Sequence, residues 1–393
     1  MRHAVIVSAT RTPIGIFNGS LSSVPATRLG SIAIGEALKK IDLRVDAVDE
    51  VIMGNVLSAG LGQAPARQAS LGAALPNSVG CTTINKVCGS SLKAVMLAAQ
   101  VIIAGDAEVV VAGGMESMSN APYLLMKARN GYRMGSGELV DSMIHDGLWD
   151  VYNQFHMGAA AEICARMLKI SRQEQDEYAL TSYGRALKAQ DAGMLAREIV
   201  PVNVPRDSLA DAAVSEDEEP KRISLSNLQN LKPAFEKHGS VTAGNASSIS
   251  DGAAALVVMS DEKARILGLK PMATIVGFTT YAAEPAWFTT APAKAIQALL
   301  QRTDRSVAGV DLFEINEAFA VCSIAVNREL RLDPNKVNVR GGAVALGHPI
   351  GASGARVLTT LIHALEDLDA RCGVASLCIG GGEAVAMMVQ REP

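Results

Sequence analysis

The amino-acid sequence predicts an α/β fold in which buried strands alternate with helices. Short apolar runs rich in β-branched residues recur along the chain, separated by Ala- and Leu-rich stretches of helical length. Because these runs are continuously apolar, they are typical of strands covered on both faces of a sheet. The strand-like runs are Ala4–Val7, Val51–Met53, Val109–Ala112, Leu256–Met259, Ala375–Ile379 and Ala384–Val389.

Size and a faint internal repeat predict two similar halves. A chain of 393 residues exceeds one ordinary domain, and 49% hydrophobic against 19% charged residues supply large cores. A Gly/Ser turn near residue 88 opens the helical stretch Ser90–Ala104, and a Val-rich strand ending Gly113-Gly114 follows. A Gly-rich turn near residue 348 opens a second helix, 352–365, and a strand ending at three glycines follows it.

The middle of the chain differs from both halves and is interpreted as an insertion of helix and loop. We divide the chain into an N-terminal half of residues 1–119 plus 250–270, an inserted domain 120–249, and a C-terminal half 271–393. Within the insertion, Ser171 followed by Glu174 is the signature of a capping box and opens a predicted helix to Ala192. The acidic run 216–219 is expected to be a solvated loop.

Composition argues against several classes of protein. The net charge is −4 and no Lys/Arg run occurs, so nucleic-acid binding is not expected. The six cysteines show neither CxxC pairing nor ligand spacing, which argues against a metal site and a disulfide framework and favours a reducing compartment. No uninterrupted apolar run approaches the roughly 20 residues that span a bilayer. With a strand-like run at the very start and no signal peptide before it, we expect a cytoplasmic protein.

The first candidate for chemistry is Cys88, just before the helix 90–104. Unpaired N–H groups and the helix dipole favour an anion at this position, so we expect a lowered thiol pKa and a nucleophilic sulfur. The alternative is a small buried hydrophobic residue, the commonest environment of a free cysteine.

Three more residues occupy turns suited to a site. His348 lies in a glycine-dense turn before a helix, where it can act as a general base or simply bond to the backbone. Cys378 ends an apolar strand, and Gly380 in the following glycine turn has an N–H group that can bind an oxyanion. Asn316 is either a hydrogen-bond donor to a ligand or a helix N-cap.

Taken together, these blocks resemble the active-site motifs of the thiolase family, in the same order. The likeness extends over the whole chain and includes segments 11–15 and 242–247; Ser91 stands where a glycine is usual. The four blocks are Asn85-Lys86-Val87-Cys88-Gly89, Asn316-Glu317-Ala318-Phe319, Gly347-His348-Pro349-Ile350-Gly351-Ala352-Ser353-Gly354 and Cys378-Ile379-Gly380-Gly381-Gly382.

The resemblance implies a five-layered αβαβα fold of two similar halves, and a homotetramer with 121–141 as an assembly loop. It also implies an acyltransferase that reversibly condenses two acetyl-CoA molecules to acetoacetyl-CoA, with no cofactor because coenzyme A is substrate and product. Cys88 would be the nucleophile, His348 its base and Cys378 the base for the second substrate. Asn316 would bind the enolate oxygen through a water, and the N–H groups of Cys88 and Gly380 would bind the tetrahedral oxyanion.

By the same resemblance, a set of mostly apolar residues forms the coenzyme A site. His156 is also consistent with a structural loop histidine, and Phe288, where bacterial relatives usually carry methionine, is equally consistent with a core residue. The phosphate contact departs from the family, because Pro220 stands where an arginine is usual; Lys221 and Arg222 are the alternatives. The site residues are Leu148, His156, Met157, Phe235, Ala243, Ser247, Phe288, Ala318 and Phe319.

Three rival functions are weighed against this one. A broad-range 3-ketoacyl-CoA thiolase would share every motif and differ in the acyl chain lengths that it accepts. A β-ketoacyl-carrier-protein synthase uses one cysteine with two histidines, or with histidine and asparagine, so the second cysteine, Cys378, argues against it. A scaffold that has lost catalysis should lack at least one of the four central residues, and none is missing.

Overall fold

The computed structural model describes residues 2–206, 209–222 and 225–392. Its main strands follow one hydrogen-bonded path in the order β14-β15-β16-β13-β1-β12-β5-β3-β4, and the short β2 (Gly15–Ile16) pairs with β12. The path divides into two parts that are joined only where β1 and β13 pair over Val5–Thr274 and Ile6–Ala273. The C-terminal part holds β14 (Leu312–Ile315), β15 (Cys372–Ile379), β16 (Glu383–Gln390) and β13 (Ala273–Ala282). The N-terminal part holds β1 (Ala4–Arg11), β12 (Ser250–Ser260), β5 (Val109–Ser117), β3 (Glu50–Gly54) and β4 (Gly80–Ile84).

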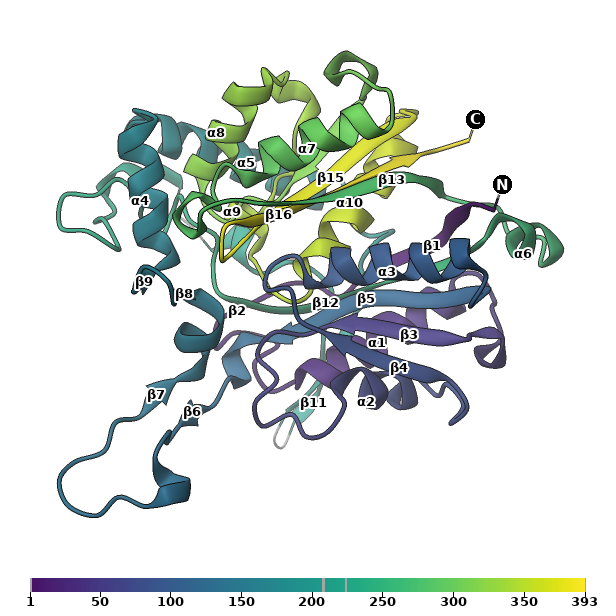
Figure 1. Ribbon diagram of the computed structural model, residues 1–393, viewed down its shortest axis with the longest axis horizontal. Coiled ribbons are helices and arrows are strands. Elements are labelled where there is room, and N and C mark those ends of the chain that lie inside the picture. The colour runs from purple at the N-terminus through teal and green to yellow at the C-terminus, as the bar shows by residue number, and fades with distance from the viewer. Residues whose placement is uncertain (1, 207–208, 223–224, 393) are drawn as a thin grey trace.

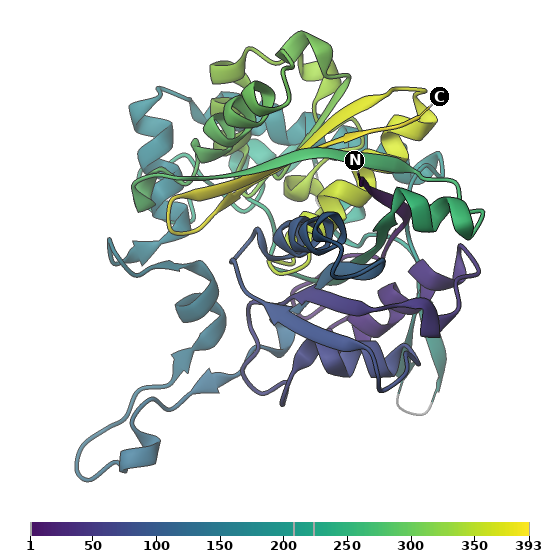
Figure 2. The same ribbon diagram turned by 45° about the vertical axis from the view of Figure 1, so that its right-hand side comes forward.

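Helices cover and separate the two parts, which gives five layers (Figure 1). On the outside, α1 (Ala26–Lys39) and α2 (Pro65–Gly72) pack on the N-terminal strands. On the opposite outside, α7 (Ala291–Arg302) and α8 (Ala320–Leu330) pack on the C-terminal strands. Figure 2 shows the central helices between the two sets of strands. These are α3 (Ser90–Ala104) and α10 (Ser353–Asp367).

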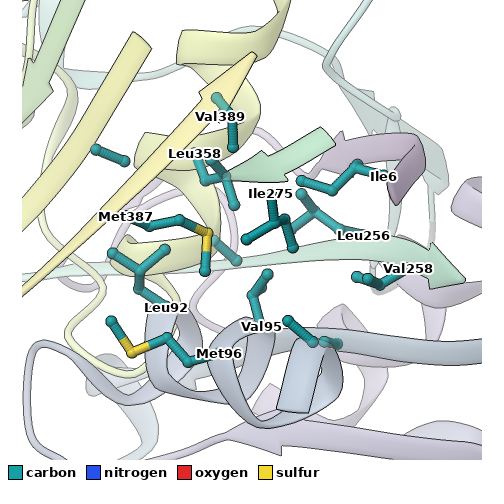
Figure 3. Close-up of a cluster of buried hydrophobic side chains, with 14 of the residues drawn as sticks. Ile6, Leu92, Val95, Met96, Leu256, Val258, Ile275, Leu358, Met387 and Val389 are labelled. Atoms are coloured by element: carbon teal, nitrogen blue, oxygen red, sulfur yellow. The ribbon is translucent and has the colours of Figure 1, made fainter. Parts of the chain in front are cut away.

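The central layer is apolar because it is covered from both sides. Ile6 and Leu256 from one set of strands and Met387 from the other meet side chains of α3 and α10 in one cluster (Figure 3). The two helices cross closely, since a Cβ atom added at Gly354 would lie 2.4 Å from the backbone nitrogen of Leu92. Ser91 also joins them: its Oγ accepts the N–H of Ala355 at 2.9 Å. The serine that departs from the family pattern therefore ties the nucleophile's helix to the histidine's helix.

The predicted elements lie where the sequence placed them. Each of the six strand-like runs falls within a strand, and the predicted helix 90–104 coincides with α3. In the insertion, the capping box of α5 (Arg172–Asp191) is present: Ser171 Oγ accepts from Glu174 N at 3.2 Å, and Ser171 N donates to Glu174 Oε2 at 2.7 Å.

The insertion contacts both halves. Its helices α4 (Met157–Met167) and α5 pack against α8 of the C-terminal half, while the hairpin β10 (Val202–Arg206)–β11 (Leu209–Val214) adds Val202 and Val204 to the N-terminal core. After the insertion, the chain returns to the N-terminal half through β12 and the short α6 (Asp261–Ile266). The C-terminal half then begins with β13. An arm bounded by β6 (Tyr123–Leu124) and β7 (Val140–Asp141) projects away from the body (Figure 1).

The interpretation of the acidic run as a solvated loop is wrong for Asp217, Glu218 and Glu219, although Glu216 is exposed. Asp217 is 1% exposed, and its carboxylate accepts from Arg11 Nη1 at 2.7 Å and Nη2 at 2.8 Å. Glu218 accepts the N–H of Ser20 at 3.0 Å, and Glu219 is buried. Arg11 is itself 0% exposed, and a buried guanidinium requires carboxylates around it. Asp217 is 206 residues away from Arg11 in the chain, so the sequence around the acidic run does not indicate that the two side chains form an ion pair.

One stretch does reach membrane-spanning length and hydropathy, which the sequence argument missed. It is the 18-residue window Val87–Ala104. In the structure this window is the central helix α3 with the turn before it, and its apolar side chains face the strands on both sides. Burial between two sets of strands accounts for its composition.

Candidate active site

A cavity of about 380 Å³ lies where the insertion meets the ends of both halves. Every predicted site residue except Cys378 and Asn316 lines it. The predicted residues on its wall are Cys88, Leu148, His156, Met157, Phe235, Ala243, Ser247, Phe288, Ala318, Phe319, His348 and Gly380. The structure thus brings together side chains from the two halves and from the insertion, within the volume range of small-molecule sites.

Cys88 is presented by a tight turn between β4 and α3. The preceding Val87 has φ +45°, an unfavourable backbone conformation for a β-branched residue. Hydrogen bonds hold it there: Val87 N donates to Asn85 Oδ1 at 2.9 Å, and Ser90 Oγ donates to Val87 O at 2.6 Å. Ser90 Oγ also accepts the N–H of Lys86 at 2.8 Å. Strain of this kind is retained where surrounding contacts fix the turn, as they do here for the candidate nucleophile.

The expectation of a lowered pKa at Cys88 is wrong for the resting protein. Burial raises the pKa of the Cys88 thiol to about 12, and the nearby Cys378 adds to the rise. The N–H groups of Gly380 and of Cys88 itself act in the opposite direction on that pKa but do not outweigh burial. Desolvation therefore exceeds the helix-terminus effect on which the sequence argument depended. The resting sulfur is a thiol, and a base must remove its proton.

His348 is held as a neutral imidazole with a defined tautomer. Ser353 Oγ donates to Pro349 O at 2.9 Å, so it accepts from His348 Nδ1, which lies 2.6 Å away. Nδ1 therefore carries the proton and Nε2 carries the lone pair. Burial, with a smaller effect of Arg356, lowers the pKa of His348 to about 3. A neutral imidazole with a free Nε2 is the form that accepts a proton.

Asn316 and Cys378 lie just behind the cavity wall. Each is 1% exposed. Asn316 Nδ2 lies 3.4 Å from His348 Nε2, and Asn316 is not a helix N-cap, because α8 begins at Ala320 with Phe319 as its N-cap. Cys378 ends β15 and packs in one apolar cluster with Phe288 and Phe319. Both residues are thus adjacent to the Cys88–His348 pair.

The rest of the wall is an apolar channel formed largely by the insertion. His156 fits both of its interpretations: Nδ1 caps α4 by accepting the N–H of Gly158 at 3.0 Å, and the ring stacks on Phe235 with centroids 4.8 Å apart. Phe288 likewise lines the cavity and is 3% exposed within the core. Ser247 Oγ donates to Ala318 O at 2.9 Å, which fixes the channel wall to the Asn316 block.

Of the two basic residues that the sequence suggests for the phosphate contact, Arg222 lines the cavity and Lys221 does not. Within the described residues, Arg222 is the one lysine or arginine among those lining the cavity. Lys221 points elsewhere and pairs with Glu216 at 2.6 Å, with both side chains about half exposed. No three His, Cys, Asp or Glu side chains converge as metal ligands in residues 2–206, 209–222 and 225–392.

Two residues near the centre carried no role in the sequence argument. Ser353, which sets the His348 tautomer, lies within a recognised block but without an assigned function. Glu116 is a fully buried carboxylate in β5, behind Cys88 and the His348 turn. A single acidic residue inside the apolar run 109–117 is the signal that could have identified it.

Two stacked α/β halves that supply a thiol and an imidazole from corresponding turns to one cavity define the architecture of a thiolase. The chain belongs to this family. Residues 4–262 match the model of the thiolase N-terminal domain, and residues 269–391 match that of the thiolase C-terminal domain. The family consists of acyltransferases, so the predicted enzyme class and the five-layered fold are confirmed.

Particular relatives are similar over their whole length. The acetyl-CoA acetyltransferase of Cupriavidus necator is 52% identical over 393 residues, covering 100% of both chains. Acetyl-CoA acetyltransferase 2 of Arabidopsis thaliana is 54% identical, over 99% of this chain and 97% of its own. The crystal structure of the Bacillus anthracis acetyl-CoA acetyltransferase superposes with a TM-score of 0.97 at 44% identity and covers 99% of each chain.

Proposed function

We propose that this enzyme reversibly condenses two molecules of acetyl-CoA to acetoacetyl-CoA and free coenzyme A, through an acetyl group carried on Cys88. The observation that carries the proposal is that a thiol, Cys88, and a neutral imidazole, His348, line the same mostly apolar cavity, whose wall also bears Arg222. The names of the full-length relatives support the same activity.

The first half-reaction follows from the two protonation states. His348 Nε2 takes the proton of the Cys88 thiol as the sulfur attacks the thioester carbon of acetyl-CoA. The developing oxyanion is stabilised by the N–H groups of Cys88 and Gly380, which are already close enough to the sulfur to act on its pKa. The bond from carbon to the coenzyme A sulfur breaks, and that sulfur leaves with the proton from His348.

The second half-reaction uses the residues behind the wall. Cys378 removes a proton from the methyl carbon of a second acetyl-CoA. The enolate oxygen lies on the side of Asn316 and His348, where a water held by Asn316 stabilises it by a hydrogen bond. Asn316 Oδ1 is suited to hold this water, because it is buried without a protein partner among the described residues. The carbanion attacks the acetyl carbon on Cys88, forms the new carbon–carbon bond and releases the Cys88 sulfur, which takes up the proton that Cys378 removed from the methyl carbon.

The test is direct. Incubation of the full-length protein with acetyl-CoA should add one acetyl group per subunit, and peptide mapping should find it on Cys88. Acetoacetyl-CoA plus free coenzyme A should be converted to acetyl-CoA without a carrier protein. Modification of another residue, or an absolute need for a carrier protein, would reject the proposal.

Assembly and location are part of the proposal. The arm 121–141 exposes Met134 at 99%, Leu139 at 67% and Tyr123 at 63%, apolar surface that a second copy of this chain would cover. We propose that copies of this chain contact one another through this arm, that the assembly is the homotetramer implied by the resemblance to thiolases, and that the enzyme acts in the cytoplasm. Light scattering on the purified protein measures the assembly, and Met134→Asp should lower its mass if the arm is the contact.

A further inference from the structure

The carboxylate of Glu116 occupies the junction between the two catalytic turns. It is 0% exposed and accepts four hydrogen bonds. Oε2 accepts the N–H of Gly351 at 2.9 Å and of Val56 at 3.0 Å. Oε1 accepts the N–H of Leu57 at 3.1 Å and Asn55 Nδ2 at 2.9 Å. One side chain thus joins the turn that carries His348 to the loop after β3.

The Gly351 peptide is held on its other side as well. A Cβ atom added at Gly114, two residues before Glu116, would lie 2.1 Å from the carbonyl oxygen of Gly351, and one added at Gly54 would lie 2.8 Å from it. The carbonyl therefore reaches the backbone of β5 and β3, while the N–H binds the carboxylate. The turn that carries His348, in the C-terminal half, thus packs directly against the ends of β5 and β3 in the N-terminal half.

The hydrogen bonds of Glu116 also fix the positions of two apolar side chains near the nucleophile, Ile350 and Leu57. Ile350, which lines the cavity, precedes Gly351, and Leu57 belongs to the loop that Glu116 binds. Both belong to one apolar cluster against which Cys88 packs. A displacement of either segment would move the histidine or the wall relative to the sulfur.

All four partners of the carboxylate are donors, so the contacts favour its ionised form. Burial raises the pKa of Glu116 to about 7, Asp251 acts in the same direction, and the three N–H donors oppose that rise. The charge in turn acts on Cys88, where it contributes to the raised pKa of the thiol. Glu116 thus affects the site by position and by charge, and the two effects can be measured separately.

We propose that Glu116 is a positioning residue that clamps the His348 turn of one half to the Cys88 side of the other, so that proton transfer occurs at the right distance. The proposal rests on the roles of Cys88 and His348 given under the proposed function. It predicts that loss of the clamp slows His348-dependent acetylation of Cys88 but leaves the sulfur reactive toward a reagent that needs no histidine.

The experiment compares two rates on Cys88 in the full-length protein, followed by mass spectrometry with peptide mapping. One is acetylation by acetyl-CoA, and the other is alkylation by iodoacetamide at the same pH. Glu116→Gln replaces one acceptor oxygen by an NH₂ group that faces donors, so acetylation should fall by roughly 10²-fold, as for a misplaced catalytic group. Alkylation should be unchanged or faster, because the charge that opposes the thiolate is gone.

Two further variants make the result decisive. Glu116→Asp keeps the charge but shortens the reach, so acetylation should fall while alkylation stays at the wild-type rate; this variant decides if glutamine prevents folding. Glu198→Gln, at another buried carboxylate bound to Arg11, should lose thermal stability but acetylate normally per folded subunit. Wild-type acetylation in both Glu116 variants, or equal loss of both reactions, would overturn the clamp. Absence of acetylation in the wild-type protein would instead reject the proposed function.

Discussion

The reacting end of the cavity and its channel are built in different ways. At the reacting end, Cys88, His348, Asn316 and Cys378 come from the two halves, and hydrogen bonds fix the histidine and the turn around Cys88. The channel wall comes largely from the insertion and is mostly apolar; among the described residues its two charged side chains outside the reacting end are the buried Glu219 and the exposed Arg222. We infer that the reacting end determines the rate of the chemical steps. The channel determines which substrate binds, through weaker contacts whose loss should cost less. Changes should therefore lower kcat at one end and shift KM or chain-length preference at the other.

The largest effect separates the two cysteines of the reacting end. Cys378→Ala should still acquire an acetyl group on Cys88, because its proposed role comes only in the second half-reaction. Condensation should fall by roughly 10²–10⁴-fold, the range for loss of a general base. Cys88→Ala should lose both steps and is the matched control. Condensation at near the wild-type rate in Cys378→Ala would show that Cys378 is only a core residue.

The second prediction concerns pH at the same end. With the Cys88 pKa at about 12, the thiolate fraction should rise tenfold per pH unit, so alkylation by iodoacetamide should increase without a plateau up to about pH 10. Acetylation by acetyl-CoA should instead be nearly flat from about pH 8 to 9, since the His348 pKa near 3 keeps the imidazole neutral there and Glu116, whose pKa is about 7, is ionised. Prior acetylation should protect the thiol. An alkylation plateau below pH 8 would mean a preformed thiolate and would restore the original expectation for Cys88.

The same contrast explains what the sequence could predict. Much of the reacting end was predictable because Cys88, His348 and Cys378 lie close to glycines or a helix start within a short block, as with Cys88 before α3. The Asp217–Arg11 pair and the Glu116 clamp were not, because their partners lie more than one element away in the chain. The thiol pKa was mispredicted for a related reason: the helix start is visible in the sequence, but the burial that outweighs it is a property of the packed structure.

The third prediction tests whether the channel side limits chain length. The Phe288 ring is packed against the cluster that holds Cys378, so we expect acetoacetyl-CoA to be preferred, with thiolysis falling by roughly 10–200-fold per added methylene that lacks space. Some activity on 2-methylacetoacetyl-CoA should remain. Phe288→Ala should raise kcat/KM for the six-carbon substrate relative to the four-carbon one. Phe313→Ala, in the core of the C-terminal half, should lose stability without changing that ratio. Rising wild-type activity toward eight carbons would favour a broad-range thiolase instead.

The smallest effect is expected at Arg222, an exposed residue of the cavity wall that we expect to contact the phosphates of coenzyme A. Arg222→Gln removes a charge-assisted contact, but the side chain is exposed, so screening should limit the loss to about 1 kcal/mol, or roughly a fivefold rise in KM. The kcat should be nearly unchanged, because the reacting end is untouched. Added salt should shrink the difference, as for any exposed ion pair.

The matched control is Lys221→Gln, next in the chain but paired with Glu216, which should leave KM close to wild type. Acetoacetyl-pantetheine carries no phosphate, and both variants should turn it over as the wild-type enzyme does. A KM increase that persists with this truncated substrate, or that is larger for Lys221→Gln, would place the phosphate contact elsewhere.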